Sequence, residues 1–187
     1  MNNDNYWENK LNSDEKLITV FSIGKGYINF MLVVTFLLCA LIFSLCFIVS
    51  RFIQDSSAIV IWFGVIVSVI IYIGFIIYYK FYLKVSYQYA LTSERVMIKE
   101  GWLQTKLTSI DYQTLTDVKV VETFTDKLFT KTASILLNTA GADATEGELK
   151  YVQNPYEIKK QIYQLAEERN IKINQSFGSN NKNIATN

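Results

Sequence analysis

Two long apolar stretches without a single charge constrain this chain more than any other feature. One covers 24 residues, 27–50, and the other covers 22 residues, 58–79. As helices that rise about 1.5 Å per residue, both would be longer than the hydrocarbon core of a bilayer, which is about 30 Å thick. A chain of 187 residues is too small to bury two such helices on every side. We therefore expect both stretches to cross a membrane.

The two expected spans form a hairpin, because only residues 51–57 connect them. Positive charge outside the spans predicts the orientation, since cytoplasmic segments carry an excess of lysine and arginine. Arg51 is the single basic residue of the connection, whereas basic residues are frequent on both outer sides: Lys10, Lys16, Lys25, Lys80, Lys84, Arg95 and Lys99. Both termini are therefore expected on the cytoplasmic side.

Small residues recur at a spacing of four in both spans. Ser44 and Gly64 are equally far from the middle of the connection, and Ala40 and Ser68 are equally far from it one turn further on. Antiparallel helices would place these residues at matching depths, where two backbones can approach closely. The alternative is coincidence, because small residues are common in membrane spans.

Composition excludes several classes of function. The chain has no histidine, so a Ser-His-Asp triad, a Cys-His pair and a histidine metal site are impossible. A formal net charge of +1 argues against nucleic acid as a partner. Both cysteines lie within the first apolar stretch, where a thiol keeps its proton. No motif for a cofactor or metal is present, and we expect neither.

The remainder divides into three parts by composition. Residues 1–26 form an N-terminal cytoplasmic segment before the hairpin, residues 80–173 form a compact domain, and residues 174–187 are a polar tail that we expect to be disordered. Alternating patterns within the domain predict short strands at 85–91, 95–99, 102–110, 117–123, 133–139 and 148–152.

The pattern then changes to that of a helix. Asn154 can cap it, Pro155 suits its first position, and apolar residues follow on one face to about Arg169. Several strands followed by one amphipathic helix indicate an antiparallel sandwich or barrel that the helix closes. The fold class is thus an α+β membrane protein with a two-helix hairpin.

The segment from Tyr89 to Val96, with the pattern Tyr-x-Leu-Thr-x-x-Arg-Val, resembles the bacterial PH-like membrane proteins. Gly101 and the segments Leu115-Thr116-Asp117-Val118 and Thr139-Ala140-Gly141 extend the likeness, although Lys127-Leu128-Phe129-Thr130 departs from it. The resemblance implies a pleckstrin-homology-like fold, with two antiparallel sheets capped by a C-terminal helix, in a bacterial cell membrane. It implies no established chemistry.

The residues of this signature segment favour a structural role. Thr92 and Arg95 are expected to hold the first turn of the domain by hydrogen bonds. With Tyr89, Leu91 and Gly101 they make up the residues of the fold-signature turn. The basic residues near the turn are balanced by Glu94 and Glu100, which disfavours a specific lipid headgroup there. A separate collar is expected to seat the chain at the membrane surface without recognising a particular lipid: Tyr79, Lys80, Phe81, Tyr82 and Lys84.

Three classes of function stay open from the sequence. The first is a non-catalytic, membrane-anchored binding or scaffold module, in which a groove or exposed strand edge of the domain engages another protein or an identical copy. The second is an accessory subunit of a membrane transport or export complex that acts through its hairpin. The third, a membrane-bound enzyme, lacks any acid-base or metal-ligand spacing.

Overall fold

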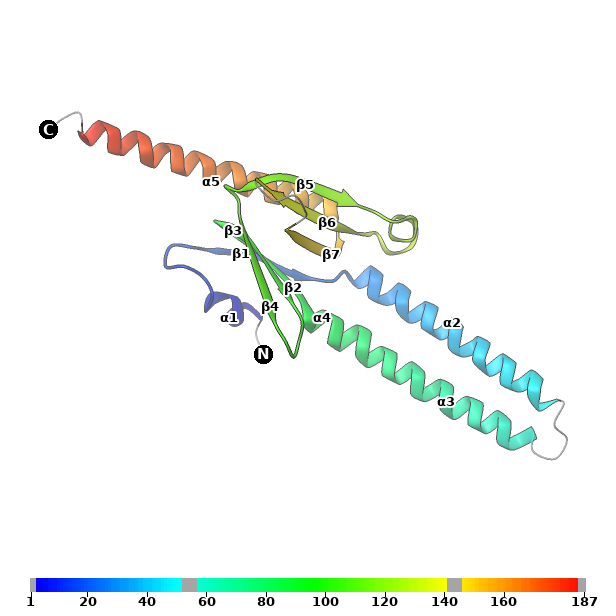
Figure 1. The fold of residues 1–187 in the computed structure, drawn as a ribbon. Coiled ribbons are helices and arrows are strands. Elements are labelled where there is room, and N and C mark those ends of the chain that lie inside the picture. Colours follow the sequence, from blue (N-terminus) through cyan, green and yellow to red (C-terminus); the bar gives the residue numbers. More distant parts are fainter. Residues whose placement is uncertain (1–2, 52–56, 141–145, 185–187) are drawn as a thin grey trace.

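A computed structural model describes residues 3–51, 57–140 and 146–184 of the chain. Two helices project together from one side of a domain made of two small sheets, and a long C-terminal helix extends from the other side (Figure 1). This arrangement confirms the expected α+β class and the PH-like fold.

The first sheet contains a strand that the sequence analysis missed. Its four antiparallel strands follow the order β1 (Leu17–Ser22), β2 (Tyr87–Thr92), β3 (Arg95–Glu100) and β4 (Lys106–Asp111). β1 precedes the hairpin and pairs with β2, which follows it, so that Ser22 lies opposite Gln88. The domain is therefore assembled from both sides of the hairpin. The expected limits of 1–26 and 80–173 divide one folded unit, because the pairing of β1 is visible only in three dimensions.

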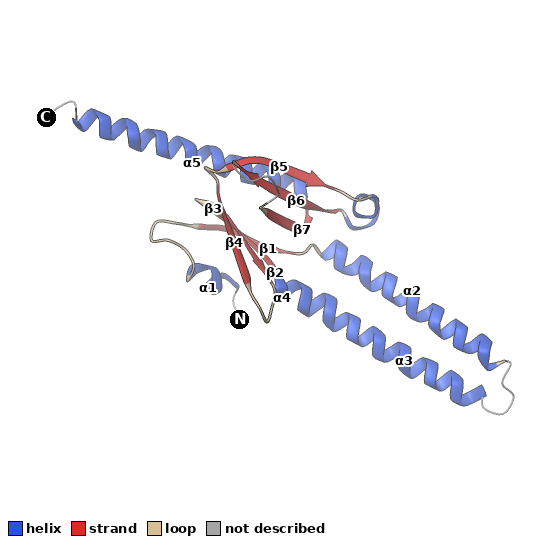
Figure 2. Ribbon diagram, in the orientation of Figure 1, coloured by secondary structure: helices blue, strands red, loops and turns tan. Residues whose placement is uncertain are grey.

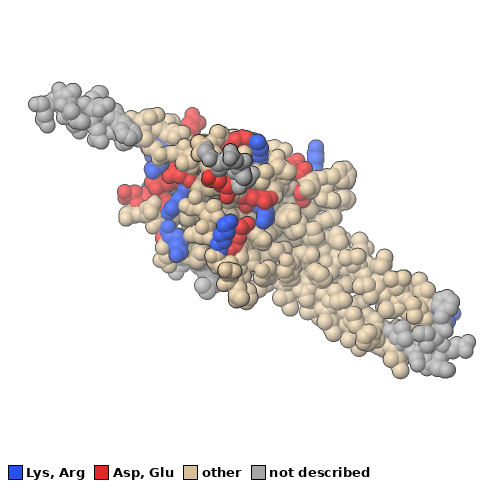
Figure 3. All heavy atoms as spheres, in the orientation of Figure 1, with Lys and Arg blue, Asp and Glu red and all other residues tan. Residues whose placement is uncertain are grey.

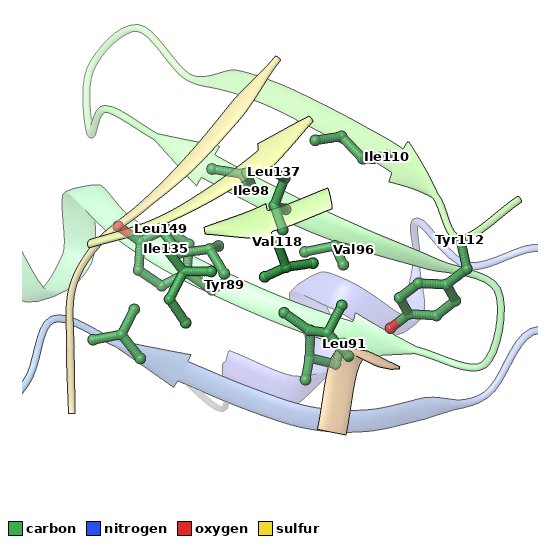
Figure 4. Close-up of a cluster of buried hydrophobic side chains, with 12 residues drawn as sticks. Tyr89, Leu91, Val96, Ile98, Ile110, Tyr112, Val118, Ile135, Leu137 and Leu149 are labelled. Carbon is green, nitrogen blue, oxygen red and sulfur yellow. The ribbon is translucent and has the colours of Figure 1, made fainter. Parts of the chain in front are cut away.

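The second sheet packs against the first to form the main core. Its strands follow the order β5 (Leu115–Val121), β6 (Thr132–Thr139) and β7 (Gly147–Gln153). Figure 4 shows side chains from both sheets pointing toward one another, among them Tyr89, Leu91, Val118 and Ile135, which are all 0% exposed. Their burial removes a continuous apolar layer from water.

All six expected strands form, but the one expected at 102–110 begins only at Lys106. Gly101 has a φ of 90°, which favours glycine, and a Cβ there would lie 2.1 Å from the carbonyl oxygen of Gln104. The chain consequently turns tightly after β3, and Trp102 and Leu103 are exposed on that turn.

The C-terminal helix α5 (Pro155–Ile184) closes the sandwich. Ile162 is fully buried in the core, and Arg169 forms an ion pair of 2.8 Å with Glu94 at the turn between β2 and β3. The helix starts at Pro155 as expected, but it continues past Arg169 to Ile184, so most of the expected disordered tail is helical. Residues 185–187 of that tail lie outside the described residues.

A short helix at the N-terminus, α1 (Asn3–Glu8), covers the outer face of the first sheet. Trp7 is fully buried there against Ala90 and Met97, whose side chains point away from the main core. Because successive residues of a strand point to opposite faces, a strand with both faces covered is buried at successive positions, as β2 is from Gln88 to Thr92.

The hairpin consists of α2 (Lys25–Ser50) and α3 (Ser57–Ile77), joined by a connection whose residues 52–56 are not described. The second helix continues through a π-helical turn, Tyr78–Tyr82, and α4 (Leu83–Ser86) directly into β2. Both helices run side by side away from the domain (Figure 2). Two 26-residue stretches, Lys25–Ser50 and Ile61–Ser86, are long and apolar enough to cross a membrane.

The surface of the hairpin differs sharply from that of the domain. Only 11% of the most apolar part of each long helix is buried within the chain. Charged side chains gather over the domain, and the hairpin surface is almost free of them (Figure 3). The helices therefore do not serve as the core of this domain.

Candidate functional site

A cavity of about 730 Å³ lies where the hairpin meets the domain. We call it the joint cavity. It is formed by the end of β1, the start of α2, the end of the second long helix and the end of β7, which are far apart in the sequence. Its lining residues are Ser22, Ile23, Gly24, Lys25, Ile28, Asn29, Lys80, Lys84 and Gln153.

The joint cavity is strongly cationic. Lys25, Lys80 and Lys84 line it, no acidic residue does, and among the described residues none of these lysines belongs to an ion pair. Asn29 and Gln153 add polar side chains at its rim. Such a concave cluster of ammonium groups can hold an anionic oxygen ligand, because it would supply charge-assisted hydrogen bonds.

The joint itself is held by close backbone packing. A Cβ on Gly26 would lie 2.0 Å from the carbonyl oxygen of Thr130, so only glycine lets α2 start this close to the domain. Gly24 donates a backbone hydrogen bond of 2.8 Å to the carbonyl oxygen of Tyr151. The ring of Tyr27 stacks on that of Tyr151 with centroids 3.8 Å apart. These contacts fix the direction in which the hairpin leaves the domain.

The expected membrane-surface collar divides into two groups. Lys80 and Lys84 line the joint cavity, and Tyr79 packs against the buried cluster of Ile23, Ile28 and Leu83. Phe81 and Tyr82 instead have 59% and 39% of their surface exposed. The structure thus brings only the lysines of the collar into one site.

Two loops add exposed apolar side chains near the same end of the domain. Trp102 lies edge to face with Tyr82, and its neighbour Leu103 is 91% exposed. In the π-helical turn Asp126–Thr130, Phe129 stacks on Phe30 at the start of α2. Both loops therefore contact the hairpin where its apolar surface begins.

The expected small-residue pairing differs from the packing seen between the helices. A Cβ on Gly64 would lie 2.9 Å from the Cβ of Cys46, whereas Ser44 is exposed. Ala40 and Ser68 line one shallow groove between the helices, but only Ser68 is buried. Counting residues from the connection sets the depth of a residue but not the rotation of its helix about the helix axis.

The signature turn binds the N-terminal segment. Thr92 donates a hydrogen bond of 2.6 Å to the carboxylate of Glu15 and accepts one of 3.0 Å from the backbone amide of Arg95. The guanidinium of Arg95 contacts both carboxylate oxygens of Glu15, at 3.0 and 2.8 Å. Because the Glu15 side chain is 0% exposed, this is a buried, bidentate ion pair.

Opposing effects act on the pKa of Glu15. Burial favours the neutral acid and raises the pKa, but the hydrogen bonds from Arg95, Thr92 and the amide of Asn12, with the charge of Arg95, outweigh it. The pKa of Glu15 therefore lies below its ordinary value of 4.5. The ionised carboxylate is the form that joins residues 10–16 to the turn.

A second, smaller hollow of about 350 Å³ lies between the edge strands β4 and β7. We call it the edge groove. Acidic and basic side chains share it, and Lys150 pairs with Glu100 at 3.4 Å. The lining residues are Ile98, Glu100, Lys106, Thr108, Leu136, Glu146, Gly147, Glu148 and Lys150. Its edges carry backbone groups that a further strand could pair with.

Within the described ranges 3–51, 57–140 and 146–184, no group of three or more Cys, Asp or Glu side chains is close enough to hold a metal ion.

Comparison with protein families shows to which family the chain belongs. The family described as Bacterial PH domain matches residues 18–166. The chain belongs to the bacterial PH domain family. No curated protein matches it.

Among solved structures, the chain is similar to a DUF1696 family protein with a pleckstrin-homology domain from Shewanella loihica PV-4. The two are 21% identical over 43% of this chain and 71% of that chain, with a TM-score of 0.34.

The matched range covers the hairpin and all of β1 except Leu17. The expected signature residues all lie in its core or turns. Tyr89 accepts a hydrogen bond of 2.8 Å from the backbone amide of Lys150, which ties the first sheet to β7, and burial raises the pKa of its phenol.

The sequence analysis did not predict the buried ion pair of Glu15 or the close packing of Gly24 and Gly26. Nothing in the sequence around Glu15 indicates an ion pair, because its partner Arg95 is 80 residues away. The two glycines flank Lys25 just before the first apolar stretch, and that spacing was a usable sign of close packing at a helix start.

Proposed function

We propose that this chain is a membrane-anchored, non-catalytic binding module whose PH-like domain lies on the cytoplasmic face of the bacterial cell membrane. The main support for this proposal is that the hairpin is inserted between two paired strands of one sheet, β1 and β2. β1 leads straight into α2, and the second long helix leads straight back into β2. A domain built on both ends of a hairpin is held at a set height and angle, which suits repeated engagement of a partner.

Several features support the membrane part of the proposal. Both long helices are apolar and largely unburied, and exposed aromatic residues surround their domain end: Phe81, Tyr82, Trp102, Phe124 and Phe129. Aromatic side chains favour the interface between lipid and water. The three lysines of the joint cavity lie at the same level, as the positive-inside rule requires of cytoplasmic segments.

Cysteine labelling tests this topology. In a chain with Cys39→Ala and Cys46→Ala, we expect an impermeant thiol reagent to modify Ser56→Cys from outside intact cells and to leave Lys160→Cys unmodified. Lysed cells serve as the control, since both variants should then react. Modification of Lys160→Cys alone in intact cells would invert the orientation.

The edge groove supports the binding part of the proposal. It has exposed strand edges on two sides and side chains of both signs, so an extended segment of a second protein or of another copy could pair with β4 or β7. Tethering to the membrane raises the effective concentration of such partners, and weak contacts then suffice for assembly.

Photo-crosslinking in native membranes distinguishes a binding module from an accessory subunit. A crosslinking amino acid at Thr108, in the edge groove, is expected to capture a partner protein or a second copy of the chain. One at Gln164, on the exposed side of α5, is the matched control. A third is placed at Ile70, which is 64% exposed on α3. Capture from Ile70 without capture from Thr108 would overturn the module and favour an accessory subunit acting through its hairpin.

A further inference from the structure

The joint cavity has the positive charge that a binding site for the phosphate group of a lipid needs. Its three lysines come from α2, the π-helical turn and α4, so the fold gathers them although they are spread over 60 positions of the chain. No acidic residue lines the cavity, so their charge is not cancelled locally. A ligand with a diffuse negative charge is therefore favoured over a neutral or cationic one.

The start of α2 borders the cavity. Its N-cap residue is Gly24, which has no side chain to accept hydrogen bonds from the first turn of the helix and whose own amide is bonded to Tyr151. The first amide groups of a helix have no partner within it. With Lys25 beside them, these groups add to the positive potential that the ammonium groups create.

The position of the cavity indicates an amphiphile rather than a fully water-soluble anion. Ile23 and Ile28 are buried in its wall. One turn further along the hairpin from Asn29 and Lys80 lie Val33 and Ile77, which are 55% and 59% exposed. Since residues three or four apart share a helix face, these apolar side chains continue the line of the cavity toward the spans.

The signature turn, by contrast, is closed to such a ligand. Glu15 already occupies the guanidinium of Arg95 and the hydroxyl of Thr92. The sequence predicts that Lys80 and Lys84 seat the chain at the membrane surface without recognising a particular lipid, because only the fold brings Lys25 beside them in the joint cavity.

We propose that the joint cavity binds the phosphate of an anionic phospholipid of the cytoplasmic leaflet, with the acyl chains lying along the exposed apolar surface of the hairpin. Lys25, Lys80 and Lys84 contact the phosphate oxygens, and Asn29 and Gln153 contact the rest of the headgroup. The inference rests on the proposed membrane location. It adds a ligand class, and its consequence is that lipid composition would stabilise the joint between hairpin and domain.

The test compares the purified full-length chain in nanodiscs of neutral phosphatidylcholine with the same nanodiscs containing phosphatidylglycerol. We expect phosphatidylglycerol to raise the unfolding temperature and to stay bound in native mass spectrometry after detergent extraction. The variant Lys25→Gln, Lys80→Gln, Lys84→Gln should bind it on the order of 100-fold more weakly, because each lysine near an anionic surface contributes a factor of about five. The matched control is Lys119→Gln, Lys160→Gln, Lys172→Gln, which removes equal charge at residues that do not line the cavity.

Each outcome decides one point. Equal retention of phosphatidylglycerol by the two triple variants would overturn the cavity as its site, and a folded Lys84→Arg variant that retains the lipid would support it. In detergent, inorganic phosphate that protects the wild type as well as phosphatidylglycerol does would identify a soluble phosphate as the ligand and overturn the lipid. If the chain enters both kinds of nanodisc but has the same unfolding temperature in each, the lipid site alone is overturned. If it enters neither, the proposed membrane location is overturned.

Discussion

At the scale of single residues, the buried carboxylate of Glu15 shows how one side chain can unite distant parts of a sheet. It receives hydrogen bonds from Thr92, Arg95 and the amide of Asn12. A buried carboxylate is costly unless it is paired and hydrogen-bonded, and here both conditions hold. The turn that carries the family signature thus binds the N-terminal segment through Glu15.

Replacing Glu15 by glutamine should destabilise the domain by about 3 kcal/mol near neutral pH, because Arg95 would keep a largely buried charge without a counterion. The folded-state pKa of Glu15 is below the ordinary 4.5, so its stabilising effect is complete above that pH and is lost as the pH falls through the folded-state pKa. Thermal unfolding in detergent from pH 3 to pH 7 measures this difference.

The matched control is Glu8→Gln, since Glu8 is exposed. A destabilisation by Glu15→Gln that stays constant below pH 4 would contradict the assignment of the ionised carboxylate to the clamp.

At the scale of elements, the hairpin is a packed pair of helices with a definite rotation. Gly64 lies against Cys46, and Cys39 and Thr35 are buried on the same face of α2. Matching depth alone would have chosen Ser44 as the neighbour of Gly64, but Ser44 is on an exposed face.

Disulfide formation tests that rotation. In a Cys39→Ala background, Gly64→Cys should crosslink to the native Cys46 on mild oxidation, because the two Cβ atoms would be closer than the roughly 3.8 Å of a relaxed disulfide and need only a small shift. Mass spectrometry of the linked peptides measures the yield.

For comparison, the variant Ser44→Cys, Gly64→Cys, with Cys39 and Cys46 replaced by alanine, carries the pair that depth alone predicts. More efficient crosslinking of this pair would refute the observed packing and restore the simpler expectation.

Gly26 tests the joint between elements. An alanine there would place its Cβ against the carbonyl oxygen of Thr130, and neither backbone can yield without moving α2 away from the domain. We expect a destabilisation of about 1–3 kcal/mol. Hydrogen exchange should accelerate at the amide of Gly24, whose bond to Tyr151 closes the joint.

Gly74→Ala is the control, since a Cβ at Gly74 would have no atom within 4 Å. If both variants exchanged alike, the close approach at Gly26 would have no part in holding the helix.

At the scale of the whole molecule, the hairpin is an insertion into a pair of neighbouring antiparallel strands. Ser22 of β1 lies opposite Gln88 of β2, so the chain leaves the sheet and returns to it at adjacent positions. The main core draws its buried residues from the two sheets and α5, with none from the two long helices. Removing the hairpin should consequently leave that core intact.

A chain in which residue 23 is joined through Asn-Gly to residue 87 should fold as a soluble domain, because Asn-Gly forms the two-residue turn that antiparallel neighbours need. Residues 80–187 alone should aggregate, since they lack β1 and leave the edge of β2 unpaired. Size-exclusion chromatography and circular dichroism of the two proteins provide the comparison. Equal solubility and equal unfolding temperature would show that β1 is dispensable.

The elements with a strong local pattern were predictable from the sequence. The two apolar helices, the six strands after the hairpin and the start of the last helix at Pro155 all follow from residue periodicity and turn chemistry, which act over a few neighbours. The extension of that helix to Ile184 was missed, because its polar composition lacks an apolar face.

By itself, the amino-acid order determined that this chain has two helices solvated by something other than its own core, and that a sandwich closed by a helix follows them. Tertiary structure alone decided that Leu17–Ser22 completes the first sheet, that Glu15 meets Arg95, and that three lysines surround one cavity. The physical reason is separation along the chain. Local propensity and periodicity report on near neighbours, whereas each of these features pairs groups that meet only when the hairpin returns the chain to the sheet.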